Sequence, residues 1–111
     1  MTAQQFAHAL GATESNNNPN APLGDDGRAL GQYQAHPDWI CTYAKVFNRW
    51  ARLNETWDSW IGDLVVLFYG RYSGKNTDVQ VAMWYHLGHF STEESADWDA
   101  VYAARFTSVS Q

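Results

Sequence analysis

Residues 57–72, WDSWIGDLVVLFYGRY, decide the fold class of this chain. Apolar side chains recur here at spacings of three and four, which is the period of an α-helix. Two more apolar residues, Val66 and Leu67, predict a helix that is buried on more than one side. A strand over 64–69 is the alternative, but the period of the flanking residues favours the helix. The stripe consists of Trp57, Trp60, Ile61, Leu64, Val65, Phe68 and Tyr72.

Helical periodicity also appears before this segment. Apolar residues at helical spacing predict a first helix over 3–14, with Thr2 as its N-cap. A second helix is predicted to begin near Pro37, a residue that suits a first turn, and to continue to Leu53. We expect Cys41, on this second helix, to be a buried small side chain.

Two further helices are predicted after residue 72. Thr77 is typical of an N-cap, and Gly88 of a helix end. Ser91 and Glu94 have the spacing of a capping box, which predicts the start of a last helix. The sequence therefore predicts about five helices and a mostly α fold.

Turn-forming residues fill the segment between the first two helices. Residues 15–27, SNNNPNAPLGDDG, cannot continue the first helix, because Asn, Pro, Gly and Asp favour turns. We expect an irregular loop or a small β-hairpin over 22–34, with Asp26-Gly27 as its turn.

Composition excludes several classes of protein. The chain has 111 residues, of which 45% are hydrophobic and 17% charged, so we expect one folded domain spanning 1–111 rather than a disordered chain. A single cysteine excludes a disulfide framework and a multi-cysteine metal site. The net charge of −5 argues against nucleic acid as a partner. No apolar stretch approaches the roughly 18 residues of a membrane span, and no cofactor is expected.

Glu14 is the most distinctive polar residue. It lies four positions after Leu10 and eight after Phe6, close to the apolar stripe of the first helix. Burial would raise the pKa of its carboxyl group and keep it protonated near neutral pH, as a proton donor in glycosidic cleavage requires. Alternatively, Glu14 only caps the helix or pairs with Arg28. Its position alone leaves both interpretations open.

The residues that follow Glu14 resemble the lysozyme-like superfamily, and within it the soluble lytic transglycosylases. That family has a Glu-Ser pair at a helix end, an Asn-Pro-Asn-Ala stretch and a Gly-Leu-Met-Gln tetrapeptide before a proline. This chain has Glu14-Ser15, residues 18–21 (NPNA), residues 31–34 (GQYQ) and Pro37. The two middle residues of the tetrapeptide differ from the family pattern.

Two later segments extend the resemblance. Residues 82–88, AMWYHLG, are similar to the family's Ala-x-Tyr-Asn-x-Gly pattern, with altered spacing and with His86 in place of asparagine. Residues 102–105, YAAR, match a Tyr-x-x-Arg pattern in the family's last helix. The matches cover 14–37 and 82–105.

The resemblance implies an α+β lysozyme-like fold, with about five helices around a cleft, and a role for each matched residue. Glu14 would be the general acid and afterwards the base. Ser15 would orient the site, Gln34 would bind an N-acetylated sugar, and Tyr33 would line the cleft beside Gly31, in the same tetrapeptide. Tyr85 would place its hydroxyl near Glu14.

A second carboxylate would distinguish hydrolysis from transglycosylation. A hydrolase commonly uses another Asp or Glu, whereas a lytic transglycosylase needs one acid because the sugar's own hydroxyl attacks. Asp25 and Asp26 are the candidates, 11 and 12 residues after Glu14. The alternative is a solvated Asp-Asp-Gly turn, and the sequence leaves both reactions open.

The function expected from these features is cleavage of the β-1,4 bond between N-acetylmuramic acid and N-acetylglucosamine in peptidoglycan, by a monomer acting at the bacterial cell wall. No secretory signal is visible, which favours a phage-encoded or virion-associated protein or a domain excised from a longer secreted chain. A non-catalytic glycan-binding module and a purely structural helical domain are the alternatives. His36, His86 and His89 lack a ligand set with zinc-like spacing, so no metal site is expected.

Overall fold

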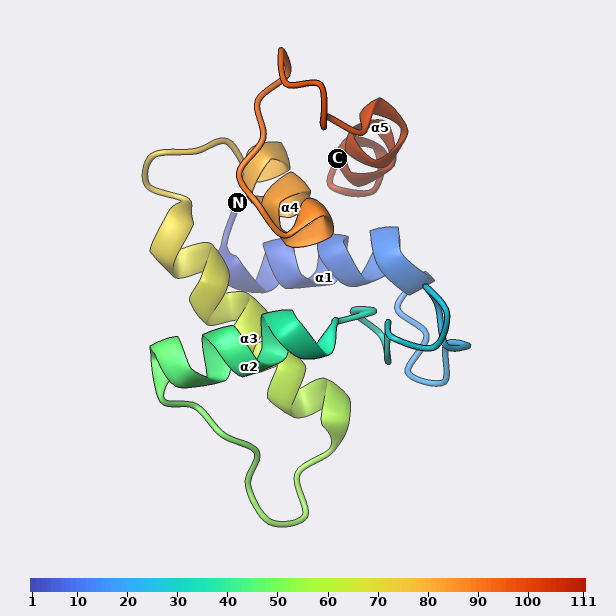
Figure 1. The fold of residues 1–111 in the computed structure, drawn as a ribbon, viewed down its shortest axis with the longest axis vertical. Coiled ribbons are helices and arrows are strands. Elements are labelled where there is room, and N and C mark those ends of the chain that lie inside the picture. Colours follow the sequence, from blue (N-terminus) through green and yellow to red (C-terminus); the bar gives the residue numbers. More distant parts are fainter.

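The computed structural model describes all residues from 1 to 111 and contains five helices, which confirms the mostly α prediction (Figure 1). Long loops join α1 to α2, α2 to α3 and α4 to α5. No regular strand is present. The helices are α1 (Ala3–Ser15), α2 (Pro37–Phe47), α3 (Trp57–Tyr72), α4 (Asp78–Leu87) and α5 (Ala100–Val109).

Helix α1 lies between two helix pairs, α2 with α3 on one side and α4 with α5 on the other (Figure 1). The predicted N-cap is confirmed, since the Thr2 side chain accepts a hydrogen bond from the Gln5 amide in a capping box. The fully buried Phe6 stacks on Tyr69 of α3, with ring centroids 4.6 Å apart, and contacts Phe106 of α5 at 5.6 Å. One side chain of α1 thus contacts both halves of the fold.

Helix α3 buries the central part of the stripe that the sequence predicted, whereas Trp57 at its start is 39% exposed. Ile61, Leu64 and Val65 are fully buried, and the ring of Phe68 packs among aromatic side chains of α2 and α4. The expectation that Leu67 would also be buried is wrong, because it is 40% exposed on the opposite side of the helix. Helix α3 therefore has one fully buried face.

Helix α2 is shorter than the sequence predicted. It ends at Phe47 because Asn48 adopts a left-handed conformation, with a φ of 47°, which asparagine tolerates better than most residues. Residues 48–56 form a loop instead of continuing the helix to Leu53. The Arg49 guanidinium holds this loop, since it donates hydrogen bonds to the carboxylates of Glu55 at 2.5 Å and Asp63 at 2.8 Å.

The predicted burial of Cys41 is wrong. The buried face of α2 carries Ile40, Tyr43 and Ala44, and Cys41 points away from that face into solvent. Apolar residues surround Cys41 in the sequence, but the rotation of the helix about its axis decides which of them are buried.

The predicted start of the last helix is also wrong. Ser91 does not cap a helix but lies buried in the α4–α5 connection, and α5 begins eight residues later at its N-cap, Asp99. The Asp99 carboxylate accepts a hydrogen bond from the Tyr102 amide at 3.0 Å.

The segment before α2 is an irregular loop rather than a regular hairpin. Two isolated antiparallel bridges join Gly24 to Ala29 and Leu30 to Ala35. The chain turns at residues 25–27, all of which have positive φ angles. This loop folds back across the C-terminal end of α1 and forms part of the candidate site.

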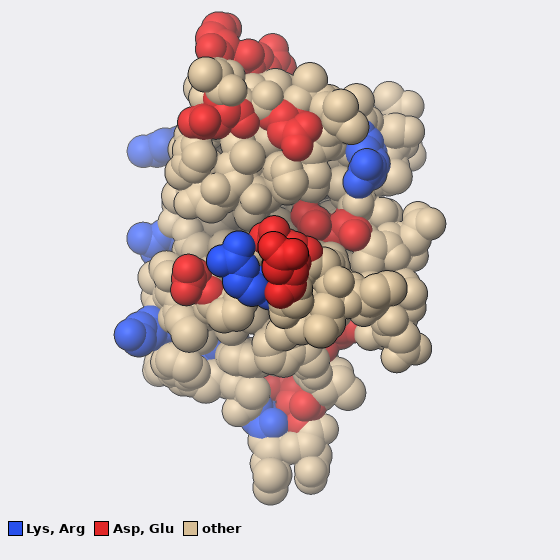
Figure 2. Space-filling model, turned by 45° about the vertical axis from the view of Figure 1, so that its right-hand side comes forward, with Lys and Arg blue, Asp and Glu red and all other residues tan.

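Charged side chains are distributed unevenly over the surface. On the face shown in Figure 2, several acidic side chains gather at the top of the molecule, and others lie at its centre and lower end among scattered basic side chains. No helix combines the length and apolar character needed to cross a membrane.

Core packing on α3 can be tested with two neighbouring residues. We expect Phe68→Ala to lower the free energy of unfolding by about 3–5 kcal/mol, because it leaves a cavity among the buried rings. Leu67→Ala, at a position that is 40% exposed, should cost less than about 1 kcal/mol. Urea unfolding followed by circular dichroism measures both losses, and equal losses would contradict the packing described.

Candidate functional site

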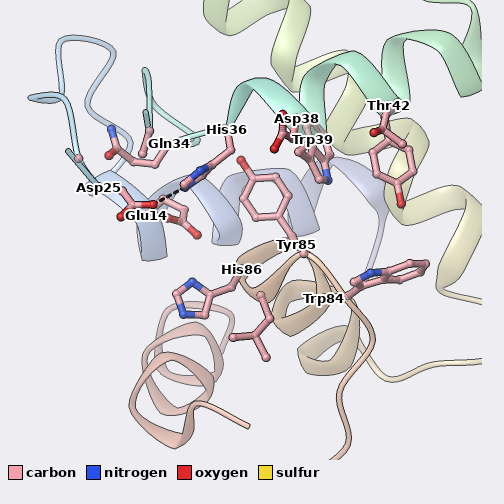
Figure 3. A pocket seen from close by; sticks show the side chains of 15 residues that line it. Glu14, Asp25, Gln34, His36, Asp38, Trp39, Thr42, Trp84, Tyr85 and His86 are labelled. Atoms are coloured by element: carbon pink, nitrogen blue, oxygen red, sulfur yellow. Dashed lines mark ion pairs between the residues drawn. The ribbon is translucent and has the colours of Figure 1, made fainter. Parts of the chain in front are cut away.

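A pocket of about 790 Å³ opens at the C-terminal end of α1 (Figure 3). Its walls come from the end of α1, the loop before α2, the first half of α2 and the end of α4. In Figure 3, Glu14, Asp25 and His36 lie toward one end of this pocket, and Thr42 and Trp84 toward the other. The lining residues are Glu14, Gly24, Asp25, Ala29, Gln34, His36, Asp38, Trp39, Thr42, Tyr43, Trp84, Tyr85, His86, Leu87 and Gly88.

Glu14 places an ionisable group at this pocket. Burial raises the pKa of its carboxyl group from 4.5 to about 7, which is the first of the two interpretations that its position in the sequence left open. A hydrogen bond from Tyr102 and the positive charge of Arg105 act in the opposite direction and stabilise the carboxylate. The two opposing effects leave a carboxyl group that can both release and accept a proton near neutral pH.

The hydroxyl that contacts Glu14 belongs to Tyr102. It donates a hydrogen bond to Glu14 Oε2 at 2.5 Å, across 88 positions of sequence. Helix α5 supplies both Tyr102 and Arg105, the two ends of the YAAR segment. That segment was the only sequence signal for this contact, and its pattern says nothing about which side chain the hydroxyl meets.

Tyr85 lines the pocket, and its hydroxyl is near enough to Glu14 to feel its charge but hydrogen-bonds a different group. It donates to the backbone carbonyl of Tyr33 at 2.5 Å and so attaches the loop to α4. Burial, with the nearby Glu14 charge as a smaller cause, raises the pKa of the Tyr85 hydroxyl well above 10. This hydroxyl therefore stays protonated and acts as a permanent hydrogen-bond donor.

Three of the matched residues hold the loop and do not line the pocket. The Ser15 hydroxyl donates to the Gln32 carbonyl at 2.6 Å, which joins the end of α1 to the tetrapeptide. Gly31 has a φ of +75°, and a Cβ there would lie 2.8 Å from the ring of Trp57. Tyr33 is buried in the core instead of lining the pocket wall.

Gln34 does lie in the pocket wall. Its side-chain amide nitrogen donates to the carbonyls of Gly31 at 2.9 Å and Pro22 at 3.3 Å. A Cβ at Gly24 would lie 2.5 Å from the Gln34 amide oxygen, so the end of the Gln34 side chain would have to shift if residue 24 were not glycine. The nitrogen thus supports the loop, and the oxygen accepts no hydrogen bond from the protein.

Only one of the two candidate second carboxylates lies at the pocket. Asp25 lines it and forms ion pairs with His36 at 3.3 Å, drawn as a dashed line in Figure 3, and with Arg28 at 3.8 Å. Asp26 is exposed in the turn and does not line the pocket. Arg28 therefore pairs with Asp25, not with Glu14.

Sequence reasoning missed the arrangement around His86. This residue lies at the pocket, its Nε2 atom is 3.0 Å from the Asp99 carboxylate, and its ring stacks on Tyr102. A second pair, His89 with Asp97, lies on the following loop, also at 3.0 Å. No group of three or more potential metal ligands occurs in the structure.

Comparisons with protein-family models, with curated proteins and with solved structures find no match for this chain.

The titration of Glu14 should appear in the stability of the protein. Its pKa is higher in the folded than in the unfolded chain, so the folded state holds the extra proton between pH 4.5 and about 7. The contribution of protonated Glu14 to the stability of the folded state is complete below pH 4.5 and is lost as the pH rises through about 7. We expect Glu14→Gln to match the wild type at pH 4 and to be more stable at pH 8, by on the order of 3 kcal/mol.

Urea unfolding of both proteins across this pH range measures the difference. Asp26→Asn is the matched control, because it removes an exposed carboxylate and should show no such pH-dependent gain. A constant difference between Glu14→Gln and the wild type from pH 4 to pH 8 would show that the carboxyl group has an ordinary pKa.

Proposed function

We propose that this protein is a glycosidase that cleaves the β-1,4 bond between N-acetylmuramic acid and N-acetylglucosamine in peptidoglycan. The observation that carries the proposal is the Glu14 carboxyl group, which faces a pocket and has a pKa of about 7. A carboxylic acid that stays protonated near neutral pH can protonate the leaving oxygen of a glycosidic bond. The substrate places this activity at the bacterial cell wall.

The proposed reaction uses Glu14 twice. First the C1–O bond breaks while the Glu14 proton passes to the leaving oxygen, and positive charge develops on the sugar ring. The Glu14 carboxylate then accepts a proton from the attacking hydroxyl as the new C1–O bond forms. Tyr102 and Arg105 stabilise the carboxylate between the two steps, since both favour its ionised form.

The pocket has a size and lining that suit sugar rings. Its volume of about 790 Å³ lies within the range of small-molecule sites. The rings of Trp84 and Tyr85 contribute apolar surface, and the Gln34 side chain in the pocket wall would bind the acetamido group through its amide oxygen, which can accept a hydrogen bond from the acetamido N–H. Aromatic faces combined with a few polar groups are the usual means of binding a saccharide.

The sequence motifs support the same proposal. The Glu-Ser pair ends α1, and Ser15 binds the backbone of the GQYQ segment. The YHLG segment supplies Tyr85 and His86 to the pocket, and the YAAR segment supplies Tyr102. Segments that are distant in the sequence thus meet around one carboxyl group, as expected if the fold is lysozyme-like with the pocket as its substrate cleft.

The two forms of the reaction differ in the role that Asp25 would have. If water attacks, Asp25, in the wall of the same pocket, is the second carboxylate that a hydrolase would use. If the sugar's own 6-hydroxyl attacks, the product is a 1,6-anhydro ring and Asp25 is dispensable.

Digestion of purified peptidoglycan by the wild type and by Glu14→Gln tests the proposal. We expect the wild type to release muropeptides and the Glu14→Gln variant to lose at least about 100-fold in rate, because the amide cannot donate the proton. The released fragments are weighed by mass spectrometry: products lighter by one water are anhydro sugars, and reducing ends mark hydrolysis.

Asp26→Asn is the control and should digest at the wild-type rate. Equal release by wild type and Glu14→Gln would remove Glu14 from the reaction. If neither protein releases fragments but both sediment with the cell wall, the chain is a glycan-binding module and the glycosidase proposal fails.

The activity should also depend on pH in a predictable direction. Because the acid must be protonated, we expect kcat/KM on a soluble muropeptide oligomer to fall as the pH rises through about 7. A rate that stays constant from pH 5 to pH 9 would exclude Glu14 as the general acid.

A further inference from the structure

A row of four side chains connects the pocket to the start of α5. Asp99, the N-cap of α5, lies 3.0 Å from Nε2 of His86. The His86 ring stacks on Tyr102 with a centroid distance of 3.9 Å and an angle of 8° between the ring planes. Tyr102 in turn donates its hydrogen bond to Glu14. Each side chain of the row thus contacts the next.

We propose that His86 is a positioning residue, whose ring, held by Asp99, keeps the Tyr102 hydroxyl directed at Glu14. The proposal deepens the function proposed above and rests on it for its catalytic consequence. The contacts themselves do not depend on the substrate. His86 does not donate a proton to the substrate in this scheme and acts only through Tyr102.

The geometry explains why a flat ring is needed at this position. Tyr102 lies on α5 and Glu14 on α1, so their hydrogen bond depends on the orientation of the Tyr102 ring. The backbone of α5 places only the Cβ atom of Tyr102. The His86 ring, which lies parallel to the Tyr102 ring, restricts the rotation of that ring. The Asp99 carboxylate contacts the His86 ring, and it also accepts a hydrogen bond from the Tyr102 amide.

Other groups near Glu14 have separate effects. Arg105 of α5 contributes positive charge, while Tyr85 of α4 binds the Tyr33 carbonyl. Asp25 and His36, from the loop and the start of α2, pair with each other in the pocket wall. Among these neighbours, Tyr102 is the one whose side chain hydrogen-bonds Glu14, so any effect of His86 on Glu14 through hydrogen bonding must pass through it.

The test measures the pKa of Glu14 by carbon-detected NMR in protein labelled at glutamate carboxyl groups. We expect Tyr102→Phe to raise this pKa by about one pH unit, because a hydrogen bond to the ionised form is lost. His86→Ala should raise it by at least half as much. In the variant that combines His86→Ala with Tyr102→Phe, the rise of the Glu14 pKa should equal that of Tyr102→Phe alone, because His86 acts on Glu14 only through the Tyr102 hydroxyl.

Two further variants distinguish positioning from other effects. His86→Phe keeps a flat ring but loses the contact with Asp99, and should return the Glu14 pKa only part of the way from the His86→Ala value to the wild-type value. His89→Ala removes the neighbouring histidine–aspartate pair, which does not contact Tyr102, and should leave the pKa unchanged. An unchanged pKa in His86→Ala would overturn the proposal, and so would a shift that adds to that of Tyr102→Phe.

The catalytic consequence is measured separately. In His86→Ala, the pH at which kcat/KM falls should rise by the same amount as the Glu14 pKa. If the wild type does not digest peptidoglycan, the proposed function fails. The NMR measurement of the Glu14 pKa still decides the role of His86 in that case. If the enzyme is active and its pH profile does not follow the Glu14 pKa, the positioning role in catalysis is excluded.

Discussion

The packing of α1 between two helix pairs is the constraint on which the candidate site depends. Phe6 contacts α3 and α5 at once, and the apolar stripe that begins with it continues toward the C-terminal end of the helix. Glu14 follows this stripe and is therefore removed from water, at the end of the helix where the dipole disfavours a negative charge. The energetic cost of that position is what raises the pKa of its carboxyl group to about 7. An exposed carboxylate would have no such property.

Helix α5 limits the effect of burial. Without the Tyr102 hydroxyl and the Arg105 charge, the pKa of Glu14 would rise further, and the group would be slow to act as a base. With them, the acid and the carboxylate are close in free energy near neutral pH, which suits a group that must first donate and then accept a proton. In the proposed role of His86, its ring stacks on Tyr102 and so keeps the Tyr102 hydroxyl in position to stabilise the Glu14 carboxylate.

The loop between α1 and α2 shows how matched sequence residues can serve structure rather than chemistry. Ser15, Gly31 and Tyr33 connect the loop to α1, to Trp57 and to the core, and only Gln34 among the matched residues of this loop lies in the pocket wall. Asp25 and Asp26 look equivalent in sequence, yet the left-handed turn presents one of them to the pocket and the other to solvent. The direction of a side chain in such a turn depends on backbone angles that no spacing rule contains.

Local patterns in the sequence determined the helical class, the caps at Thr2 and Thr77 and most of the buried stripe of α3, because these follow from neighbours three or four residues apart. They placed Glu14 near the apolar stripe of α1 but left its burial open. The end of α2 at Asn48 and the start of α5 at Asp99 were not predictable, since several polar residues nearby could have served as caps. Only the tertiary structure brought Tyr102 to Glu14 and His86 to Tyr102. Those contacts join α1, α4 and α5, and they depend on how three helices pack together, a property that no single segment of the sequence carries.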